Sequence, residues 1–185
     1  SLYELMTEKP INKISVTEIC ERADVNRSTF YAYYTDIYDL HKSIVAEFFV
    51  LQKNVIKHIK ESIRTKTALT EFTYQDFYQI VYYYFKTVKE NTDLYKFIFN
   101  QNADNTVHAS FAKITYQTIK EVLNPLIVDE RAEELKKAFT FVAGGTTAHI
   151  IKWIETDCAT PIETLSTYVA KYYYGTFKAH TMEIL

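Results

Sequence analysis

The side chains best suited to chemistry in this sequence are one arginine and several hydroxyls in the stretch NRSTFYAYY, residues 26–34. An arginine offers a planar fork of donors that fits the O6 and N7 acceptors of guanine. Hydroxyl groups at the start of a helix suit phosphate oxygens. Both residue types also have common structural roles, because a lone arginine is usually a solvated charge and a Ser-Thr pair usually caps a helix. The stretch therefore indicates either a nucleic-acid contact or an ordinary helix start.

The chain lacks the residue patterns of an enzyme. None of its five histidines has a partner at catalytic spacing, and the sequence has neither a phosphate-binding loop nor a nucleophile motif. These histidines are His41, His58, His108, His149 and His180. Cys20 and Cys158 lie far apart and belong to no metal-ligand spacing, which predicts buried, reduced cysteines. We therefore expect no enzymatic activity, no cofactor and no metal site.

Composition favours an all-α protein. The 185 residues are 48% hydrophobic and 24% charged, which is enough apolar material for a sizeable core. Only three glycines and three prolines are present, whereas an all-β chain would need a turn at roughly every 8–12 residues. No apolar run approaches the roughly 20 residues of a membrane span and no signal peptide is visible, so we expect a cytoplasmic protein that binds no membrane. The formal net charge of −2 counts against nucleic-acid binding.

Three helix starts follow one another within about 22 residues. Ser15 and Glu18 have the spacing of a capping box, in which each side chain accepts from the amide of the other residue. Asp24 stands where a left-handed residue would end that helix, and Asn26 and Asp36 are the next N-cap candidates. Helices this short cannot stand alone and must pack as a compact unit. This arrangement predicts a helix-turn-helix.

The stretch SVTEICERADVNRSTFYAYYTDIYDL, residues 15–40, resembles the DNA-binding signature of TetR-family transcriptional regulators. The matching positions include Ser15, Val16, Ile19, Ala23, Val25, Thr29, Phe30, Tyr31, Tyr33, Tyr34 and Leu40. The resemblance implies a helix-turn-helix DNA-binding domain over residues 1–46, whose first helix would begin before Ser1, so that its N-terminus is expected to be truncated here. It implies a helical effector-binding and dimerisation domain over residues 47–185.

The resemblance also implies roles for individual side chains, because the second helix of the motif, about residues 27–34, enters the major groove of DNA in this family. The positions that would read base edges are Arg27, Ser28, Ala32 and Tyr33. Thr17 would touch a base or a phosphate, and the positions that would hold phosphates are Ser15, Thr29 and Tyr31.

Several features depart from the family pattern. Asp24 replaces the usual glycine of the turn, and Ile37 stands where a lysine commonly reaches a phosphate. Residues 1–46 hold five Lys/Arg against seven Asp/Glu, although a DNA-binding module is expected to be basic. The acidic balance leaves a second interpretation open, in which the fold is kept but regulation works through a protein partner.

Beyond Leu40 the apolar spacing indicates longer helices. One amphipathic helix of about 27 residues would start at Leu40 and join the two domains. Further helices are expected at 74–89, 94–100 and 107–123, the last ended by Pro125. In TetR-like proteins such helices enclose an effector pocket, and the candidates to line one are Tyr74, Tyr78, Phe97, Phe111, His149 and Trp153. With 16 tyrosines and 12 phenylalanines in the chain, each candidate is otherwise explained as a core or surface residue.

The last third of the chain predicts a pair of helices. Asp129 would cap the first, and Thr160, Pro161 and Glu163 have the spacing of a capping box at the start of the second. The stretch FVAGGTTAHIIKWI, residues 141–154, followed by such a helix resembles the C-terminal end of one TetR subgroup, where two helices per subunit form a four-helix dimer interface. The candidate interface residues are Phe139, Val142, Gly145, Thr146, Ile150, Ile162, Leu165, Tyr168, Val169 and Tyr172.

These features lead us to expect a homodimeric, ligand-responsive transcriptional regulator, a repressor, whose partners are palindromic double-stranded operator DNA and an unknown small-molecule effector. A palindromic operator needs two motifs held about one helical turn apart, roughly 34–36 Å. The alternative is a TetR-fold regulatory protein that acts through a protein partner and does not bind DNA itself.

Overall fold

The computed structural model describes residues 1–68, 71–99, 116–118, 120–121 and 131–181. Within these ranges the regular secondary structure is helical and includes no strand, which confirms the all-α prediction. No helix in the same ranges combines the length and the hydropathy that a bilayer span requires. The chain divides into two compact units. Unit 1 consists of Ser1–Gln52 and Thr92–Ala109, and unit 2 consists of Lys53–Asn91 and Ser110–Leu185.

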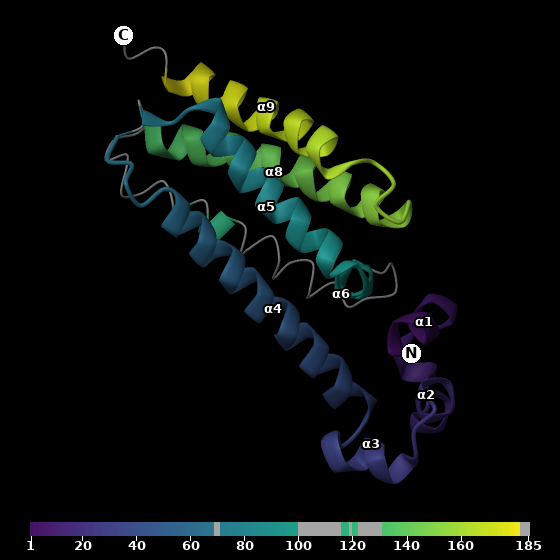
Figure 1. Cartoon of the computed structure of the whole chain (residues 1–185). Helices are drawn as coiled ribbons and strands as arrows, with labels where there is room; N and C mark the ends of the chain where they lie inside the picture. The colour runs from purple at the N-terminus through teal and green to yellow at the C-terminus, as the bar shows by residue number, and fades with distance from the viewer. Residues whose placement is uncertain (69–70, 100–115, 119, 122–130, 182–185) are drawn as a thin grey trace. The chain divides into compact units, whose positions relative to one another are not determined.

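Unit 1 contains the short N-terminal helices and the first part of a long one (Figure 1). Its elements are α1 (Leu2–Glu8), the 3-10 helix η1 (Ile11–Lys13), α2 (Val16–Ala23), α3 (Arg27–Tyr33), the beginning of α4 (Ile37–Ser62) and α6 (Thr92–Ile98). Helices α2 and α3 contact each other. Their buried side chains are Ile19, Cys20 and Phe30. The predicted helix-turn-helix is confirmed.

Local hydrogen bonds explain where α2 begins and ends. The backbone N–H of Glu18 donates to Ser15 Oγ (3.2 Å), and the Glu18 carboxylate accepts from the Ser15 N–H (2.8 Å), so the predicted capping box is present. Asp24 adopts the left-handed conformation (φ 52°), and its N–H bonds back to the carbonyls of Cys20 and Glu21. This residue ends α2 as predicted, because an aspartate tolerates this conformation better than most residues. Only residues 24–26 separate α2 from α3.

Helix α4 has the length that its apolar spacing predicts. It covers 26 residues, from Ile37 to Ser62. Its first turn is capped by Asp36, whose carboxylate accepts from the Asp39 N–H (2.8 Å). By contrast, Asn26 is the N-cap residue of α3 but makes no side-chain capping bond. The domain boundary expected after residue 46 and the division of the units after Gln52 both lie within α4.

A buried hydrogen bond joins α6 to α4 inside unit 1. Gln52 Nε2 donates to the Tyr95 hydroxyl (2.9 Å), and both side chains are buried. The ring of Phe48 packs edge-on against Tyr95, with 5.4 Å between the ring centroids. Helix α6 also contacts α1. The core of unit 1 therefore includes a segment that is distant in sequence from the other helices of the unit.

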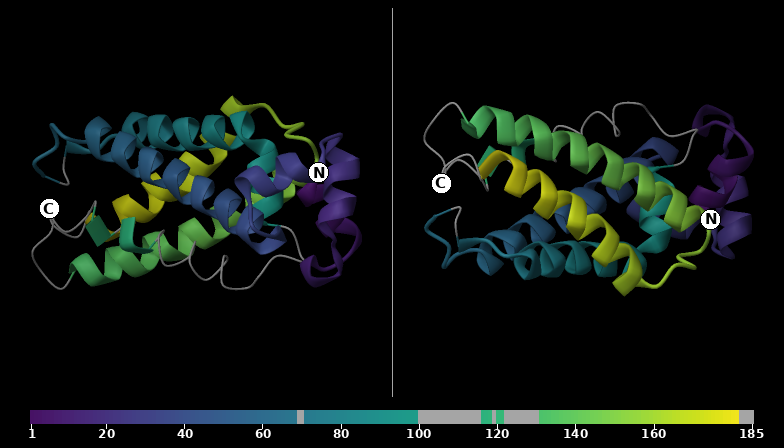
Figure 2. Two further views of the ribbon diagram at one scale, coloured as in Figure 1. Left: turned by 90° about the horizontal axis from the view of Figure 1, so that it is seen from below. Right: turned by 90° about the horizontal axis from the view of Figure 1, so that it is seen from above.

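Unit 2 contains three long helices, α5 (Tyr74–Glu90), α8 (Arg131–Glu155) and α9 (Ile162–Thr181). Helix α9 contacts both α5 and α8, and α8 and α9 run antiparallel (Figure 2). Their buried side chains include Phe77, Val81, Phe85, Leu135, Phe139, Ile150, Trp153, Leu165, Val169 and Phe177. Of the helix expected at 107–123, only residues 116–118 and 120–121 are described, and Asp129 lies outside the described residues.

The turn between α8 and α9 differs from the sequence prediction. Among the described residues, the side chains of Thr160 and Glu163 make no capping bond, so the expected capping box does not form. The Thr160 carbonyl instead accepts a hydrogen bond from the indole N–H of Trp153 (2.9 Å). A carbonyl can satisfy a buried indole donor from any residue type, so the spacing of side chains gave no indication of this bond.

Candidate nucleic-acid interface

Helix α3 leaves most of its side chains on the surface of unit 1. Phe30 is its buried residue. Tyr31 and Tyr33 are 50% and 77% exposed, which is high for large aromatic side chains. The other exposed residues of this helix are Arg27, Ser28, Thr29 and Ala32. All the α3 residues that the sequence places at a DNA contact are therefore accessible.

Arg27 is oriented by a neighbour on the same helix. Its guanidinium carbon lies 5.9 Å from the centroid of the Tyr31 ring, one turn further along, which is within the range of a cation–π contact. The Tyr31 ring packs edge-on against the buried Phe30, with 5.5 Å between centroids. These contacts connect the exposed guanidinium to the core and restrict the conformations that Arg27 adopts before it meets a partner.

The two predicted contacts around the start of α2 differ in how free their hydroxyls are. The Ser15 hydroxyl donates to Glu18 Oε2 (2.8 Å) and accepts from the Glu18 N–H, so its proton is used within the chain. Thr17 is exposed, and its hydroxyl makes no hydrogen bond to the described residues. Thr17 is therefore the better donor toward a phosphate, and the capping box is the role that the structure supports for Ser15.

Two ion pairs fasten α2 to the elements before it. Lys9 pairs with Glu18, and Arg22 donates to both carboxylate oxygens of Glu8, at 2.7 and 3.3 Å. The Lys9 ammonium and the donors of Ser15 lower the pKa of Glu18 to about 2. The hydrogen bond from Arg22 lowers the pKa of Glu8. The cations of Lys9 and Arg22 are thus engaged inside unit 1.

Glu18→Gln is expected to remove part of the acid sensitivity of the protein. The pKa of Glu18 lies below its ordinary value of 4.5, so its ionised contacts stabilise the fold above about pH 4.5 and are lost as the pH falls toward about 2. The free energy of unfolding of the wild type should therefore fall more steeply across this window than that of the variant. Urea denaturation followed by circular dichroism at several pH values measures the free energy of unfolding of both proteins.

The control for this experiment is Glu21→Gln, which removes an exposed carboxylate from the same helix. Glu21 has no ion-pair partner among the described residues, so its variant should keep the wild-type pH profile. If Glu18→Gln also kept that profile, the contacts of Glu18 would contribute nothing to stability.

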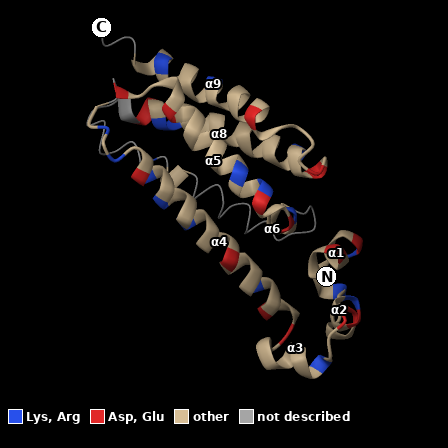
Figure 3. Ribbon diagram, in the orientation of Figure 1, with Lys and Arg blue, Asp and Glu red and all other residues tan. Residues whose placement is uncertain are grey.

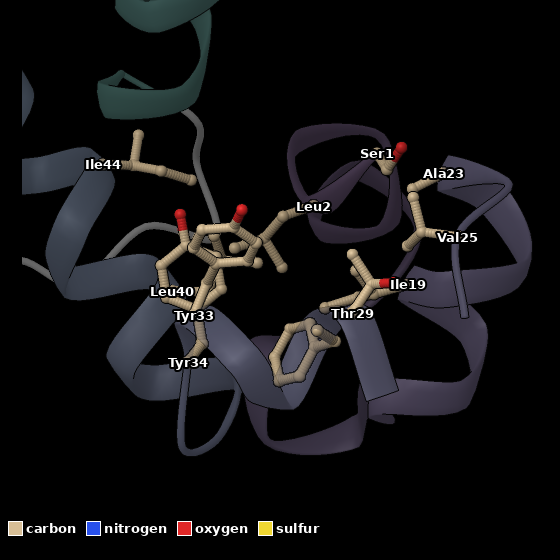
Figure 4. A pocket seen from close by; sticks show the side chains of 11 residues that line it. Ser1, Leu2, Ile19, Ala23, Val25, Thr29, Tyr33, Tyr34, Leu40 and Ile44 are labelled. Carbon is tan, nitrogen blue, oxygen red and sulfur yellow. The ribbon is translucent and has the colours of Figure 1, made fainter. Parts of the chain in front are cut away.

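A pocket of about 320 Å³ lies beside α3 in unit 1 (Figure 4). Its lining is mainly apolar and comprises Ser1, Leu2, Ile19, Ala23, Val25, Thr29, Phe30, Tyr33, Tyr34, Leu40 and Ile44. Thr29 and Tyr33 border this pocket, whereas Arg27, Ser28 and Tyr31 do not. The pocket contains none of the six residues that were expected to line an effector site.

Those six effector candidates do not form a single cluster within the described part of the chain. Phe97 belongs to unit 1, where the centroid of its ring lies 5.2 Å from that of His41. Phe111 lies outside the described residues. The ring contacts in unit 2 fall into separate groups, namely Tyr74 with Tyr78, Trp153 with Phe85, and His149 with Tyr168. An effector site formed by these residues therefore stays a prediction.

The ten residues expected at a dimer interface divide between the interior and the surface of unit 2. Those buried within the single chain are Phe139, Thr146, Ile150, Leu165 and Val169. Those at least partly exposed are Val142, Gly145, Ile162, Tyr168 and Tyr172. The ring of Phe139, for example, already contacts Phe77 (6.1 Å) and Tyr173 (5.7 Å). The buried set contributes to the fold of one subunit, and the exposed set is available to a second.

The outward surface of α8 and α9 also includes Phe141, which the sequence analysis did not single out. Phe141 is 85% exposed, and a Cβ added at Gly144 or Gly145 would meet no atom within 4 Å. The ring centroids of His149 and Tyr168 lie 5.5 Å apart. The Tyr168 hydroxyl accepts a hydrogen bond from the Tyr172 hydroxyl (3.1 Å). We use the name α8/α9 face for the surface formed by Phe141, Gly144, Gly145, His149, Tyr168 and Tyr172.

Two family models match the chain. The model described as "Bacterial regulatory proteins, tetR family" matches residues 2–44, which include α1, α2 and α3. The model described as "Transcriptional regulator C-terminal region" matches residues 75–175, from α5 into α9. No curated protein matches the chain.

Proposed function

This chain belongs to the TetR family of transcriptional regulators, and from that premise we propose that it is a homodimeric repressor that binds a palindromic operator and responds to a small-molecule effector. The observation that carries the proposal is the exposed surface of α3, where Arg27 is held against Tyr31 while Phe30 anchors the helix. An oriented guanidinium fits the edge of a guanine, and a helix of this kind fits the major groove.

The contacts that we propose divide into two classes. Base edges are read by Arg27, Ser28, Ala32 and Tyr33. Phosphates are held by Thr17, Thr29 and Tyr31, while Ser15 keeps α2 in place through its capping box. Phosphate contacts set the position of a protein on DNA, and base contacts set its sequence preference.

The dimer is proposed to form through the α8/α9 face. Residues 138–151 of α8 contain no Lys, Arg, Asp or Glu, so the central part of that helix offers an uncharged surface. Exposed aromatic side chains such as Phe141 and Tyr168 supply apolar area that a second copy would bury. A two-fold dimer contains two copies of α3, one for each half of a palindrome.

Effector response is the remaining part of the proposal. It is supported by the match of residues 75–175 to a regulator C-terminal region. An effector can release the operator only if it binds the DNA-bound and the free protein with different affinities. Operator-binding assays in the presence of candidate compounds measure that difference.

Binding-site selection with the 185-residue chain tests the proposed function. Random duplexes are incubated with the protein, recovered and sequenced, and we expect enrichment of palindromic sites with half-sites about one helical turn apart. The double variant Arg27→Ala, Tyr31→Ala is the control and should enrich no site. Failure of the wild type to enrich any site would favour the alternative of a regulator that works through a protein partner. That alternative is suggested by the eight acidic and five basic residues of residues 1–52.

A further inference from the structure

The middle of α8 contains one titratable side chain, His149. Residues 138–151 include no Lys, Arg, Asp or Glu, and the charged residues of α8 gather toward its two ends (Figure 3). His149 is exposed in the single subunit and belongs to the α8/α9 face. In the neutral and acidic range, a charge on this face therefore depends on the protonation of one imidazole per subunit.

The hydrogen of neutral His149 is placed on a defined nitrogen. Nδ1 lies 3.0 Å from the carbonyl oxygen of Gly145, and a carbonyl oxygen can only accept, so Nδ1 carries the hydrogen. Nε2 then holds a lone pair, and it makes no hydrogen bond with the described residues. A proton taken up at acidic pH therefore goes to Nε2 and gives the ring a positive charge.

The side chains that α9 places beside His149 do not neutralise that charge. The ring centroid of Tyr168 lies 5.5 Å from that of His149, and the hydroxyls of Tyr168 and Tyr172 are bonded to each other (3.1 Å). The hydrogen bond with Tyr172 raises the pKa of Tyr168, so this hydroxyl carries no negative charge near neutral pH. A protonated His149 therefore faces neutral aromatic groups.

The charged neighbours along the two helices do not favour a cation either. Within one turn of His149 and of Tyr168 the sequence has no Asp or Glu, whereas Lys152 and Lys171 lie in these turns. Lys152 donates to Glu155 (3.2 Å), and Lys171 makes no ion pair with the described residues. A like charge close by disfavours the charged form of an imidazole.

Resting on the proposed dimer, we propose that His149 makes the assembly of this regulator sensitive to pH, with the neutral imidazole buried against the second copy and protonation at Nε2 separating the subunits. Burial in an apolar interface disfavours the charged form of a histidine. The stability that neutral His149 gives the dimer is therefore complete above about pH 6.5 and is lost as the pH falls. A separated subunit carries one copy of α3 and can hold one half-site only.

Sedimentation velocity of the 185-residue chain between about pH 8 and pH 5.5 tests this inference. Each of the two imidazoles takes up a proton when the dimer dissociates, so the dissociation constant should rise by up to about 100-fold per pH unit below about pH 6.5. Circular dichroism should show an unchanged fold over this range, because the contacts of Glu18 are lost only at more acidic pH.

Variants at His149 assign the effect to this residue. His149→Gln keeps a polar side chain that does not titrate, so its dimer should be as stable at pH 5.5 as at pH 8. His149→Lys is charged throughout this range and should be monomeric already at pH 8. The matched control is His180→Gln. His180 makes the same kind of contact, from Nδ1 to the Thr176 carbonyl (2.7 Å), but lies outside the α8/α9 face, so this variant should keep the wild-type pH dependence.

The outcomes separate this inference from the proposed function. A wild type that is monomeric at every pH would contradict the proposed dimer and this inference with it. A wild-type dimer of constant affinity from pH 8 to pH 5.5, or a His149→Gln variant with the wild-type pH dependence, would refute the role of His149 and leave the dimer in place. A His149→Lys dimer as tight as the wild type would refute that role in the same way.

Discussion

Gly145→Leu is expected to convert the proposed dimer into monomers without unfolding the subunit. Gly145 is exposed, and an added Cβ meets no atom of its own chain within 4 Å. A leucine in place of a helical glycine even favours the helix by about 1 kcal/mol. In the dimer the same side chain would overfill the α8/α9 face, at about 1–3 kcal/mol per copy. Because a two-fold interface contains the substitution twice, the dissociation constant should rise by roughly 30- to 10⁴-fold.

Sedimentation velocity at micromolar concentration measures the oligomeric state of this variant, and a thermal melt followed by circular dichroism measures its fold. The matched control is Gln79→Leu, which places an exposed leucine on α5 and should leave the dimer intact. A wild type that sediments as a monomer, or a Gly145→Leu variant that remains dimeric, would show that the α8/α9 face is not the interface.

Arg27→Ala should weaken operator binding by about 1–3 kcal/mol for each half-site, or roughly 5- to 150-fold. The physical reason is that one guanidinium supplies both donors to a guanine edge, and no other cation of α3 can replace it. The melting temperature should change little, because Arg27 is exposed and its contact within the chain is with the Tyr31 ring. Fluorescence anisotropy with labelled operator at fixed salt gives the affinity.

Arg64→Ala is the control for that measurement. Arg64 is an exposed arginine of unit 2 that makes no ion pair with the described residues, so its loss changes the net charge equally. If both variants weakened binding alike, the effect of Arg27 would be one of charge alone. An unchanged isotherm for Arg27→Ala would exclude this residue from base reading.

The boundaries of α2 in unit 1 were predictable because they depend on residues close in sequence. The capping box joins Ser15 to Glu18, three positions further along the chain, and the left-handed Asp24 depends on its own side chain. Interactions of this range are decided by residue type and spacing. The helix-turn-helix follows, because short amphipathic helices have to pack together to bury their apolar sides.

The outward surface of unit 2 was not predictable in the same way. Phe139 and Phe141 are two residues apart in α8, and one is buried while the other is 85% exposed. The sequence around them is apolar on all sides of the helix, so periodicity does not define which side faces the core. The contacts of α9 with α5 and α8 decide which side of α8 faces the core.

The aromatic candidates for an effector site illustrate a second limit. Trp153 was selected as a large aromatic residue on one helix, yet it is buried against Phe85 and bonded to the Thr160 carbonyl. A chain with 28 tyrosines and phenylalanines uses most of them to fill space. Residue type alone does not distinguish an aromatic side chain that fills the core from one that lines a cavity.

The position of α6 within unit 1 has a consequence for how the protein can be divided. Tyr95 bonds to Gln52 and packs on Phe48, and α6 also contacts α1. A fragment that ended at Gln52 would keep α1, α2 and α3 but would leave this buried surface open to water. During synthesis the same surface stays uncovered until residues 92–98 have been added to the chain. The DNA-binding part of this chain is therefore not an independent, transferable module, because its core is completed only by a segment made after α5.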